Sequence, residues 1–206
     1  MNKKSTESYP EIWALVLAAG RSERMGVQKL LLPLGENTMI GSVVDHIVSA
    51  GIDHILLVLG SHREEVERAV CEKPVITCFN PDYAEGMHTS VICGFRQLPV
   101  DTLAVVVFLG DQPFIPAEVI KMLITNWELT GKMIIIPTYR GYRGHPTLFD
   151  CRLKEEVLQM DPHIGLRSVI DRFPQEISEV ETHFSVIIRD IDTKNDYLNE
   201  LNQIGE

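Results

Sequence analysis

The chain has 206 residues, of which 45% are hydrophobic and 23% are charged, and its formal net charge at pH 7 is -10. This composition is typical of a soluble globular protein, and the length favours one domain over residues 1–206, with an ordered core from about residue 11 to about residue 200. The acidic balance argues against binding to nucleic acid or to anionic membranes, because both need a basic face. It still permits a local basic pocket for a small anion.

The cysteines and the first residues of the chain indicate the compartment. None of the four cysteines stands in a C-x-x-C pair or has the histidine spacing of a zinc site, so we expect free thiols in a reducing cytosol. They are Cys71, Cys78, Cys93 and Cys151. Residues 1–13 lack an apolar run long enough for a signal peptide, and no stretch of about 18 apolar residues predicts a membrane span. We therefore expect a cytoplasmic protein.

Short apolar runs rich in β-branched residues alternate along the chain with segments of helical periodicity. The runs predict strands over residues 12–18, 54–60, 74–80, 103–110, 132–137 and 184–191. The intervening segments predict helices over 39–50, 63–70, 88–98, 116–129, 165–173 and 194–204. Gly51 is expected to end the first helix and Thr193 to cap the last one.

This alternation predicts an α/β fold, a Rossmann-like doubly wound three-layer sandwich with a mainly parallel sheet. In such sheets, ligands bind at the carboxyl ends of the strands. Every predicted strand from the first to the fifth is followed there by glycine or polar residues. The segments are LAAGRSERMG, LGSH, FNPDYAEGMHTS, FLGDQP and PTYRGYRGHP.

The first loop has the features of a phosphate site but fits neither common phosphate motif. It lacks the lysine–serine or lysine–threonine pair of a P-loop and the three glycines of a dinucleotide fold. The small residues Ala18, Ala19 and Gly20 would let the backbone approach a base or a phosphate closely. Arg24 could hydrogen-bond phosphate oxygens in a fork, and Lys29 could add a point charge. The alternative is a strand–helix turn with solvated basic residues.

Five motifs in order resemble those of the nucleotidyltransferases that load molybdopterin with a nucleotide. LAAGRSERMGVQK matches the signature L-A-x-G-x-S-x-R-M-G-x-x-K, and NPDYAEGMHTSV, FLGDQPFI, GYRGHPTLF and RDIDTKNDY follow. The combination of LAAG, GDQP and GHP is most similar to the molybdenum cofactor cytidylyltransferases, including accessory proteins of xanthine dehydrogenase-type hydroxylases. The resemblance implies a fold of the nucleotidyltransferase (nucleotide-diphospho-sugar transferase) type.

The resemblance implies transfer of CMP from CTP to the terminal phosphate of molybdopterin or molybdenum cofactor, with release of pyrophosphate. Mg²⁺ is the expected cofactor, with Mn²⁺ as an alternative, and a molybdenum hydroxylase apoprotein is a further candidate partner. Because two anions must meet, charge neutralisation and positioning should matter more than acid–base chemistry. Arg24, Lys29 and Asp111 are the candidate catalytic residues.

Carboxylates at two places are candidate metal ligands. Asp111 follows an apolar strand, and the helix after it is expected to start at Pro116, so Asp111 is not needed as a cap. Asp190 and Asp192 stand two apart on an extended segment and should share a face. The residues do not decide between them. Asp192 is preferred because the resemblance places an aspartate–threonine pair at the head of the helix, although it could simply be an acid near a helix N-terminus.

The resemblance also implies the binding residues. Ser90, after the turn at Gly86, would read the base or would instead cap the helix, two roles that we weigh equally. Gly144 and His145 would contact the acceptor, although His145 could instead simply pack before Pro146. His62 could border the base, and His88 is interpreted as a surface residue. The candidate nucleotide-binding set is Leu17, Ala18, Ala19, Gly20, Arg21, Arg24, Lys29, Gly60, Asn80, Gly86 and Ser90.

Two other functions stay open. The same fold could transfer a nucleotide to a sugar phosphate or another alcohol phosphate, because pyrophosphorylases share the first motif in outline. The chain could also be a non-catalytic chaperone that carries cofactor to a hydroxylase. The presence of Arg24, Lys29 and Asp111 argues against a degenerate catalytic set.

Overall fold

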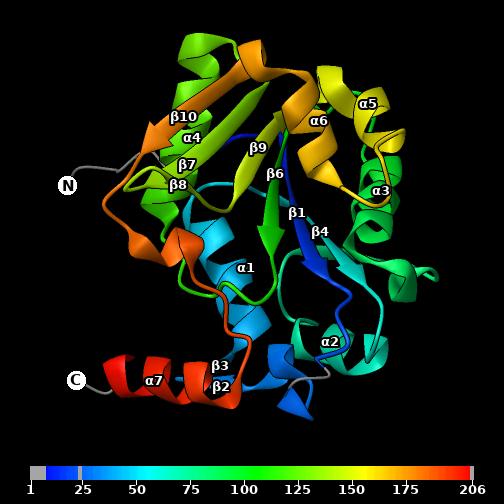
Figure 1. Ribbon diagram of the computed structural model, residues 1–206. Coiled ribbons are helices and arrows are strands. Elements are labelled where there is room, and N and C mark those ends of the chain that lie inside the picture. Colours follow the sequence, from blue (N-terminus) through cyan, green and yellow to red (C-terminus); the bar gives the residue numbers. More distant parts are fainter. Residues whose placement is uncertain (1–7, 23–24, 205–206) are drawn as a thin grey trace.

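The computed structural model describes residues 8–22 and 25–204, and its centre is an eight-stranded sheet (Figure 1). The strand order is β10-β7-β9-β6-β1-β4-β5, and β8 pairs with β7. The strands are β1 (Ile12–Ala18), β4 (His54–Leu59), β5 (Val75–Phe79), β6 (Ala104–Leu109), β7 (Ile134–Tyr139), β8 (Tyr142–Arg143), β9 (Thr147–Asp150) and β10 (Ile177–Glu181). A small antiparallel pair, β2 (Pro33–Leu34) and β3 (Asn37–Thr38), lies outside this sheet.

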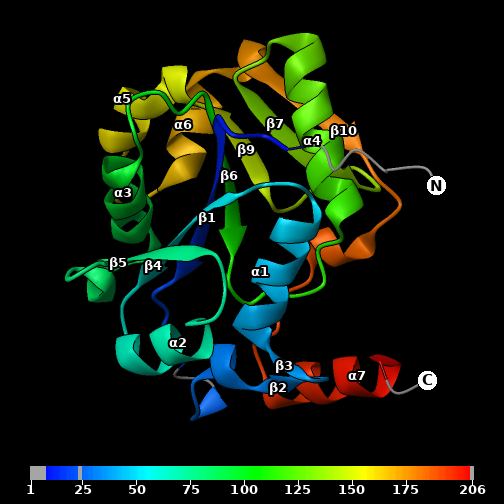
Figure 2. The same cartoon turned by 180° about the vertical axis from the view of Figure 1, so that it is seen from behind.

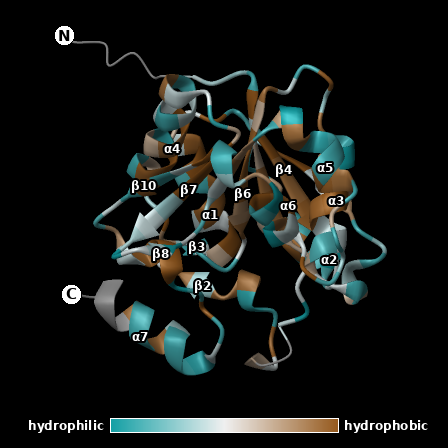
Figure 3. Cartoon of the chain, turned by 45° about the horizontal axis from the view of Figure 1, so that its top comes forward, coloured by the Kyte–Doolittle hydropathy of each residue, from teal (hydrophilic) through white to brown (hydrophobic). Residues whose placement is uncertain are grey.

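Helices cover both faces of the sheet, as the predicted three-layer sandwich requires (Figure 2). They are α1 (Met39–Ser49), α2 (Arg63–Ala69), α3 (Met87–Gln97), α4 (Ala117–Thr130), α5 (Lys154–Leu158), α6 (Leu166–Arg172) and α7 (Lys194–Ile204). Apolar residues of α1, α2 and α4 share one core cluster with Val16 of β1, whereas those of α3, α5 and α6 share the other with Leu15. The central strands are hydrophobic along their length (Figure 3). Because successive strand residues point to opposite faces, these strands contribute to both core clusters. None of the described helices is long and apolar enough to cross a membrane.

The predicted mainly parallel sheet is confirmed. Strands β6, β1, β4 and β5 run parallel, as do β7 and β10, whereas β9 runs antiparallel between β6 and β7. The chain proceeds from β1 outward to β4 and β5 on one side and returns to β6 on the other. The strand order therefore switches direction between β1 and β6, which is where an open α/β sheet forms its ligand crevice.

The sheet beyond β6 differs from the prediction. Residues 184–191 were expected to form a strand, but Ser185–Ile188 form a 3₁₀ turn, and the edge position belongs to β10. The Ile187 side chain is fully buried in the core, and its carbonyl accepts a hydrogen bond from the His145 amide at 2.8 Å. This apolar run was therefore wrongly assigned to the sheet, because it packs across the sheet end.

Both predicted helix boundaries are confirmed. Gly51 follows α1 with a φ of +93°, a left-handed conformation that glycine adopts without strain. At the start of α7, the Thr193 hydroxyl accepts a hydrogen bond from the Asp196 amide at 3.2 Å, and the Asp196 carboxylate accepts one from the Thr193 amide at 2.7 Å. This reciprocal pair is a capping box, which fixes the path of the preceding segment.

Candidate active site

A cavity of about 610 Å³ opens at the carboxyl ends of β1 and β6, where the strand order switches. Its volume lies in the range typical of sites for small molecules. Eleven of the predicted site residues line it: Leu17, Ala18, Ala19, Gly20, Arg21, Lys29, Gly86, Ser90, Asp111, Asp190 and Asp192. The prediction for Arg24 lies outside the described residues.

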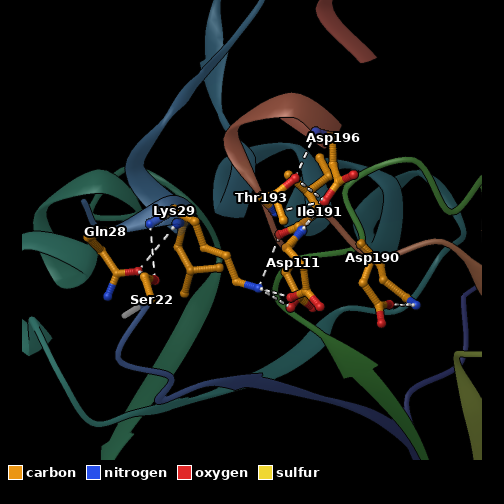
Figure 4. A network of polar contacts seen from close by, with 11 residues as sticks. Ser22, Gln28, Lys29, Asp111, Asp190, Ile191, Thr193 and Asp196 are labelled. Atoms are coloured by element: carbon orange, nitrogen blue, oxygen red, sulfur yellow. Dashed lines mark hydrogen bonds and ion pairs between the residues drawn. The ribbon is translucent and has the colours of Figure 1, made fainter. Parts of the chain in front are cut away.

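The loop after β1 folds back on itself and directs Lys29 into the cavity (Figure 4). The Ser22 hydroxyl donates to Gln28 Oε1 at 2.6 Å and accepts from the Lys29 amide at 3.1 Å. Gln28 is buried, and its Nε2 donates to the Gly20 carbonyl at 3.4 Å. Ser22 has a φ of +54°, which is unusual for a residue other than glycine. These contacts hold the turn that positions the lysine.

Lys29 joins two carboxylates from distant parts of the chain. Its Nζ donates to Asp111 Oδ2 at 2.5 Å, to Asp192 Oδ1 at 3.1 Å and to the carbonyl oxygen of Ile191 at 3.1 Å. Burial lowers the pKa of Lys29, but the charges and hydrogen bonds of Asp111 and Asp192 outweigh burial, so the pKa is raised. The ammonium group therefore stays charged at neutral pH.

Backbone contacts bring the two carboxylates together. Gly110 donates from its amide to the Leu17 carbonyl at 3.0 Å, which ties the end of β6 to the end of β1 just before Asp111. The Ile191 amide donates to the Asp111 carbonyl at 3.3 Å, so the segment leading into α7 is anchored beside β6. The capping box of α7 then fixes Asp192, whose amide donates to the Asp196 carboxylate at 3.2 Å. The metal ligands expected at two distant motifs thus lie at one place.

Asp190 and Asp192 both line the cavity, yet they contact different partners. Asp190 Oδ1 accepts a hydrogen bond from the buried Gln112 side chain at 2.5 Å, whereas Asp192 shares Lys29 with Asp111. Asp192 therefore shares a partner with Asp111 and Asp190 does not, while the choice between them as metal ligand stays a prediction.

The structure separates the two roles considered for Ser90. Helix α3 has Gly86 as its N-cap, so the helix-capping alternative for Ser90 is wrong. The buried Ser90 hydroxyl accepts a hydrogen bond from Asn80 Nδ2 at 3.0 Å and lines the cavity. Asn80 is also buried and does not line the cavity, and its predicted contact with the nucleotide stays a prediction. Gly86 has a φ of +126°, which explains the glycine at this turn.

Gly60, Gly144 and His145 do not line the cavity, and their predicted contacts with ligands stay predictions. A Cβ on Gly60 would lie 2.7 Å from the Ala19 carbonyl oxygen, and one on Gly144 would lie 2.3 Å from that of Ile187. Close backbone approach therefore explains both glycines. Burial lowers the pKa of His145, although Asp190 and Asp111 act in the opposite direction. This imidazole thus lies behind the carboxylates, and its Nδ1 has no hydrogen-bond partner among the described residues.

The remaining histidines also lie outside the cavity lining. His62 is exposed and precedes α2 with a φ of +57°, and its Nδ1 is 3.6 Å from a Glu65 carboxylate oxygen. It was considered as a border of the base pocket, and the cavity does not include it. His88 is partly exposed and does not line the cavity, which agrees with its interpretation as a surface residue.

Several lining residues were missed from the sequence: Ser22, Met25, Leu30, Tyr83, Ala84, Met87 and Leu109. Tyr83 is the most informative, because the Arg21 guanidinium carbon lies 5.7 Å from the centre of its ring. The ring and the guanidinium thus form part of the cavity wall together. Tyr83 stands inside a recognised motif, and that position was the available signal.

The carboxylates fit a divalent cation that is shared with a phosphate substrate. No group of three or more His, Cys, Asp or Glu side chains that could hold a metal occurs in residues 8–22 and 25–204. Magnesium, however, needs only one or two carboxylates when phosphate oxygens and waters complete its shell. Asp111 and Asp192 supply such carboxylates, and the Ile191 carbonyl oxygen lies beside them.

Comparisons with known proteins identify similar chains. A family model described as "MobA-like NTP transferase domain" matches residues 14–179. The molybdenum cofactor cytidylyltransferase of Escherichia coli is 29% identical over 188 residues, which cover 89% of this chain and 92% of that protein.

Solved structures give the same picture. Rv0371c from Mycobacterium tuberculosis has a TM-score of 0.83 at 26% identity, covering 94% of this chain and 98% of that one. Its complex with manganese has a TM-score of 0.74 at 24% identity, covering 93% of this chain and 98% of that one. A nucleotidyl transferase from Methanothermobacter thermautotroptrophicus has a TM-score of 0.80 at 27% identity, covering 93% and 96% of the two chains.

Proposed function

The chain belongs to the MobA-like NTP transferase family, and we propose that this nucleotidyltransferase moves CMP from CTP to the terminal phosphate of molybdopterin or its molybdenum form. The observation that carries the proposal is the cluster of Lys29, Asp111 and Asp192 at the switch point of the sheet. The Lys29 ammonium lies between two carboxylates and beside a loop of small residues. This combination suits the binding of a nucleoside triphosphate together with its metal ion.

The proposed reaction is an attack by an acceptor phosphate oxygen on the α-phosphorus of CTP. The bond between the α-phosphorus and its bridging oxygen breaks, and pyrophosphate leaves with the electron pair. A bound divalent metal at Asp111 and Asp192 would neutralise the charge of both reactants. Lys29 would hold phosphate oxygens, and the backbone of Ala18 to Gly20 would face the nucleotide. A phosphate nucleophile is already ionised near neutral pH, so a general base is not required.

The metal is proposed as Mg²⁺, with Mn²⁺ as an alternative. The manganese complex of Rv0371c supports a divalent cation at this fold. The oxygen donors of Asp111, Asp192 and Ile191 suit either ion, because both are bound by hard oxygen ligands.

The choice of cytosine and of molybdopterin rests on two different observations. Ala19 lines the cavity with a methyl group where a glycine would leave more room, which favours the smaller pyrimidine over a purine. The acceptor is inferred from the Escherichia coli relative. Gly144 and His145 are packed away from the cavity, so their contribution would be to support the acceptor side rather than to touch the acceptor.

An acceptor screen tests the proposal. Pyrophosphate release from CTP and Mg²⁺ is expected with molybdopterin and not with sugar 1-phosphates, and Asp111→Ala should abolish it. Asp45→Ala is the matched control, because Asp45 is exposed and pairs with Lys73 away from the cavity. Turnover with sugar 1-phosphates alone would assign a different acceptor. Equal turnover by Asp111→Ala would contradict the metal-binding role.

A further inference from the structure

The three oxygens around Lys29 use all the hydrogen-bonding capacity of its ammonium group. An ammonium has three donors, and here they meet two carboxylate oxygens and one carbonyl oxygen. The Lys29 side chain is 14% exposed, so little water competes for these contacts. A phosphate oxygen can therefore bind this ammonium only if Lys29 gives up at least one of the three.

The same three oxygens are the kind that a hard divalent cation binds. Two of them come from Asp111 and Asp192, and the third is the Ile191 carbonyl oxygen. Lys29 thus takes the place that a metal would share with these groups. A divalent cation brought to the same carboxylates would face the positive charge of Lys29 at close range, where repulsion is strong because the site is partly buried.

A nucleoside triphosphate changes this balance. Its anionic tail attracts Lys29 away from the carboxylates and at the same time supplies phosphate oxygens for the metal. Extending the proposed function, we propose that Lys29 blocks the metal position of the nucleotide-free protein, so that the divalent cation binds only together with the triphosphate. Lys29 is then a counter-ion that keeps the two carboxylates close before substrate arrives and a phosphate ligand afterwards.

Binding of Mn²⁺ alone, measured by electron paramagnetic resonance without nucleotide or acceptor, tests the block. Lys29→Met removes the charge at similar side-chain length, and we expect it to bind Mn²⁺ at least about tenfold more tightly than the unmodified protein. Lys29→Arg keeps the charge and should bind Mn²⁺ as weakly as the unmodified protein. Lys73→Met is the matched control, because Lys73 also pairs with a carboxylate, Asp45, at 2.5 Å but outside the cavity.

The double variant Lys29→Met/Asp192→Asn locates the gained ion. It should lose the tighter binding of Lys29→Met, whereas retention would place the ion elsewhere and overturn the proposal. Equal Mn²⁺ affinity of the unmodified protein and Lys29→Met would also overturn it. Thermal unfolding of each variant verifies folding, and Lys29→Gln replaces Lys29→Met if the latter is unfolded.

A second measurement tests the proposed contact between Lys29 and the triphosphate. In excess chelator, CTP should bind to the unmodified protein by calorimetry and should bind more weakly to Lys29→Met. Equal CTP affinity of the two proteins would contradict the proposed move of Lys29 from the carboxylates to the phosphates. Neither measurement uses molybdopterin, so a protein that passes both and yet fails to modify molybdopterin would refute only the proposed function.

Discussion

The two halves of the sheet use their polar residues differently. On the β1, β4 and β5 side, the loop after β1 and the first turn of α3 present Lys29, Ser90 and small residues to an open cavity. On the β7, β9 and β10 side, Gly144 and His145 lie under the 3₁₀ turn Ser185–Ile188, and Asp150 is bound by its own neighbours. Motifs that look equally functional in the sequence therefore divide into one set that lines the cavity and another that packs against the 3₁₀ turn.

The carboxylates Asp111 and Asp150 give the largest contrast between the halves. Asp111→Asn should lower kcat for pyrophosphate release by about 10²–10³-fold and change stability little, because it removes charge at the reacting phosphates. Asp150 is buried and accepts hydrogen bonds from Arg152 and from the Trp127 ring nitrogen, each at 2.8–2.9 Å. Asp150→Asn should instead reduce the free energy of unfolding by about 1–3 kcal/mol with kcat retained. Steady-state kinetics and urea unfolding of both variants check these expectations. Loss of stability in Asp111→Asn together with loss of kcat in Asp150→Asn would contradict the difference between the two sides of the sheet.

Two glycines give the next contrast. A Cβ on Gly144 would meet the backbone of Ile187 at 2.3 Å, whereas one on Gly20 would meet nothing within 4 Å. Gly144→Ala should therefore lower the free energy of unfolding by about 2–3 kcal/mol, since backbone atoms must move. Gly20→Ala should leave stability within about 0.5 kcal/mol and raise the dissociation constant for CTP. Urea unfolding and calorimetry distinguish the two, and a stable Gly144→Ala protein would break the comparison.

A substitution of Ala19 tests the preference for cytosine over guanine. Ala19→Gly enlarges the cavity by one methyl group, so discrimination between CTP and GTP should fall by about fivefold, as one methyl group is worth about 1 kcal/mol. The ratio of kcat/KM for the two nucleotides measures the effect. An unchanged ratio would mean that the methyl group does not contact the base.

The pH dependence of unfolding tests the role of His145 on the β7, β9 and β10 side of the sheet. Burial lowers its pKa, with Asp190 and Asp111 opposing, so the folded protein resists the proton that an unfolded histidine binds below a pH of about 6.5. Stability from the neutral ring is therefore complete above that pH and is lost as pH falls. The drop in Tm from about pH 7.5 to about pH 5.5 should be smaller in His145→Gln than in the unmodified protein. Equal drops would show that the ring does not stay neutral when folded.

The part of the sheet that lines the cavity could be predicted from the sequence, because its strands and the residues after them are recognisable from short local patterns. Strands β1, β4 and β6 are apolar runs buried on both faces, and the residues after β1 and β6 necessarily meet at the switch point. The sequence alone therefore predicts that Asp111 and Lys29 lie close together.

The structure of the β7, β9 and β10 side depends on contacts between residues that are distant in the sequence. The β10 sequence ISEVE has only two apolar residues, and both of its glutamates are exposed, whereas FSVIIRDI is the more apolar run. The segment that joins the sheet is the one that pairs with β7. The Thr138 hydroxyl of β7 donates a hydrogen bond to Glu181 of β10 at 2.6 Å. The burial of Gly144 beneath Ile187 and of Asn80 behind Ser90 likewise depends on side-chain placement that spacing does not reveal.

A competition between nucleotides tests the central claim most directly. The protein is supplied with Mg²⁺, molybdopterin and equal concentrations of CTP and GTP, and the products are identified by mass spectrometry. We predict that molybdopterin gains CMP in clear excess over GMP, that pyrophosphate is released in equal amount, and that Asp111→Asn forms the CMP product about 10²–10³-fold more slowly. An excess of the GMP product, or unmodified molybdopterin beside an active sugar-phosphate control, would contradict the account.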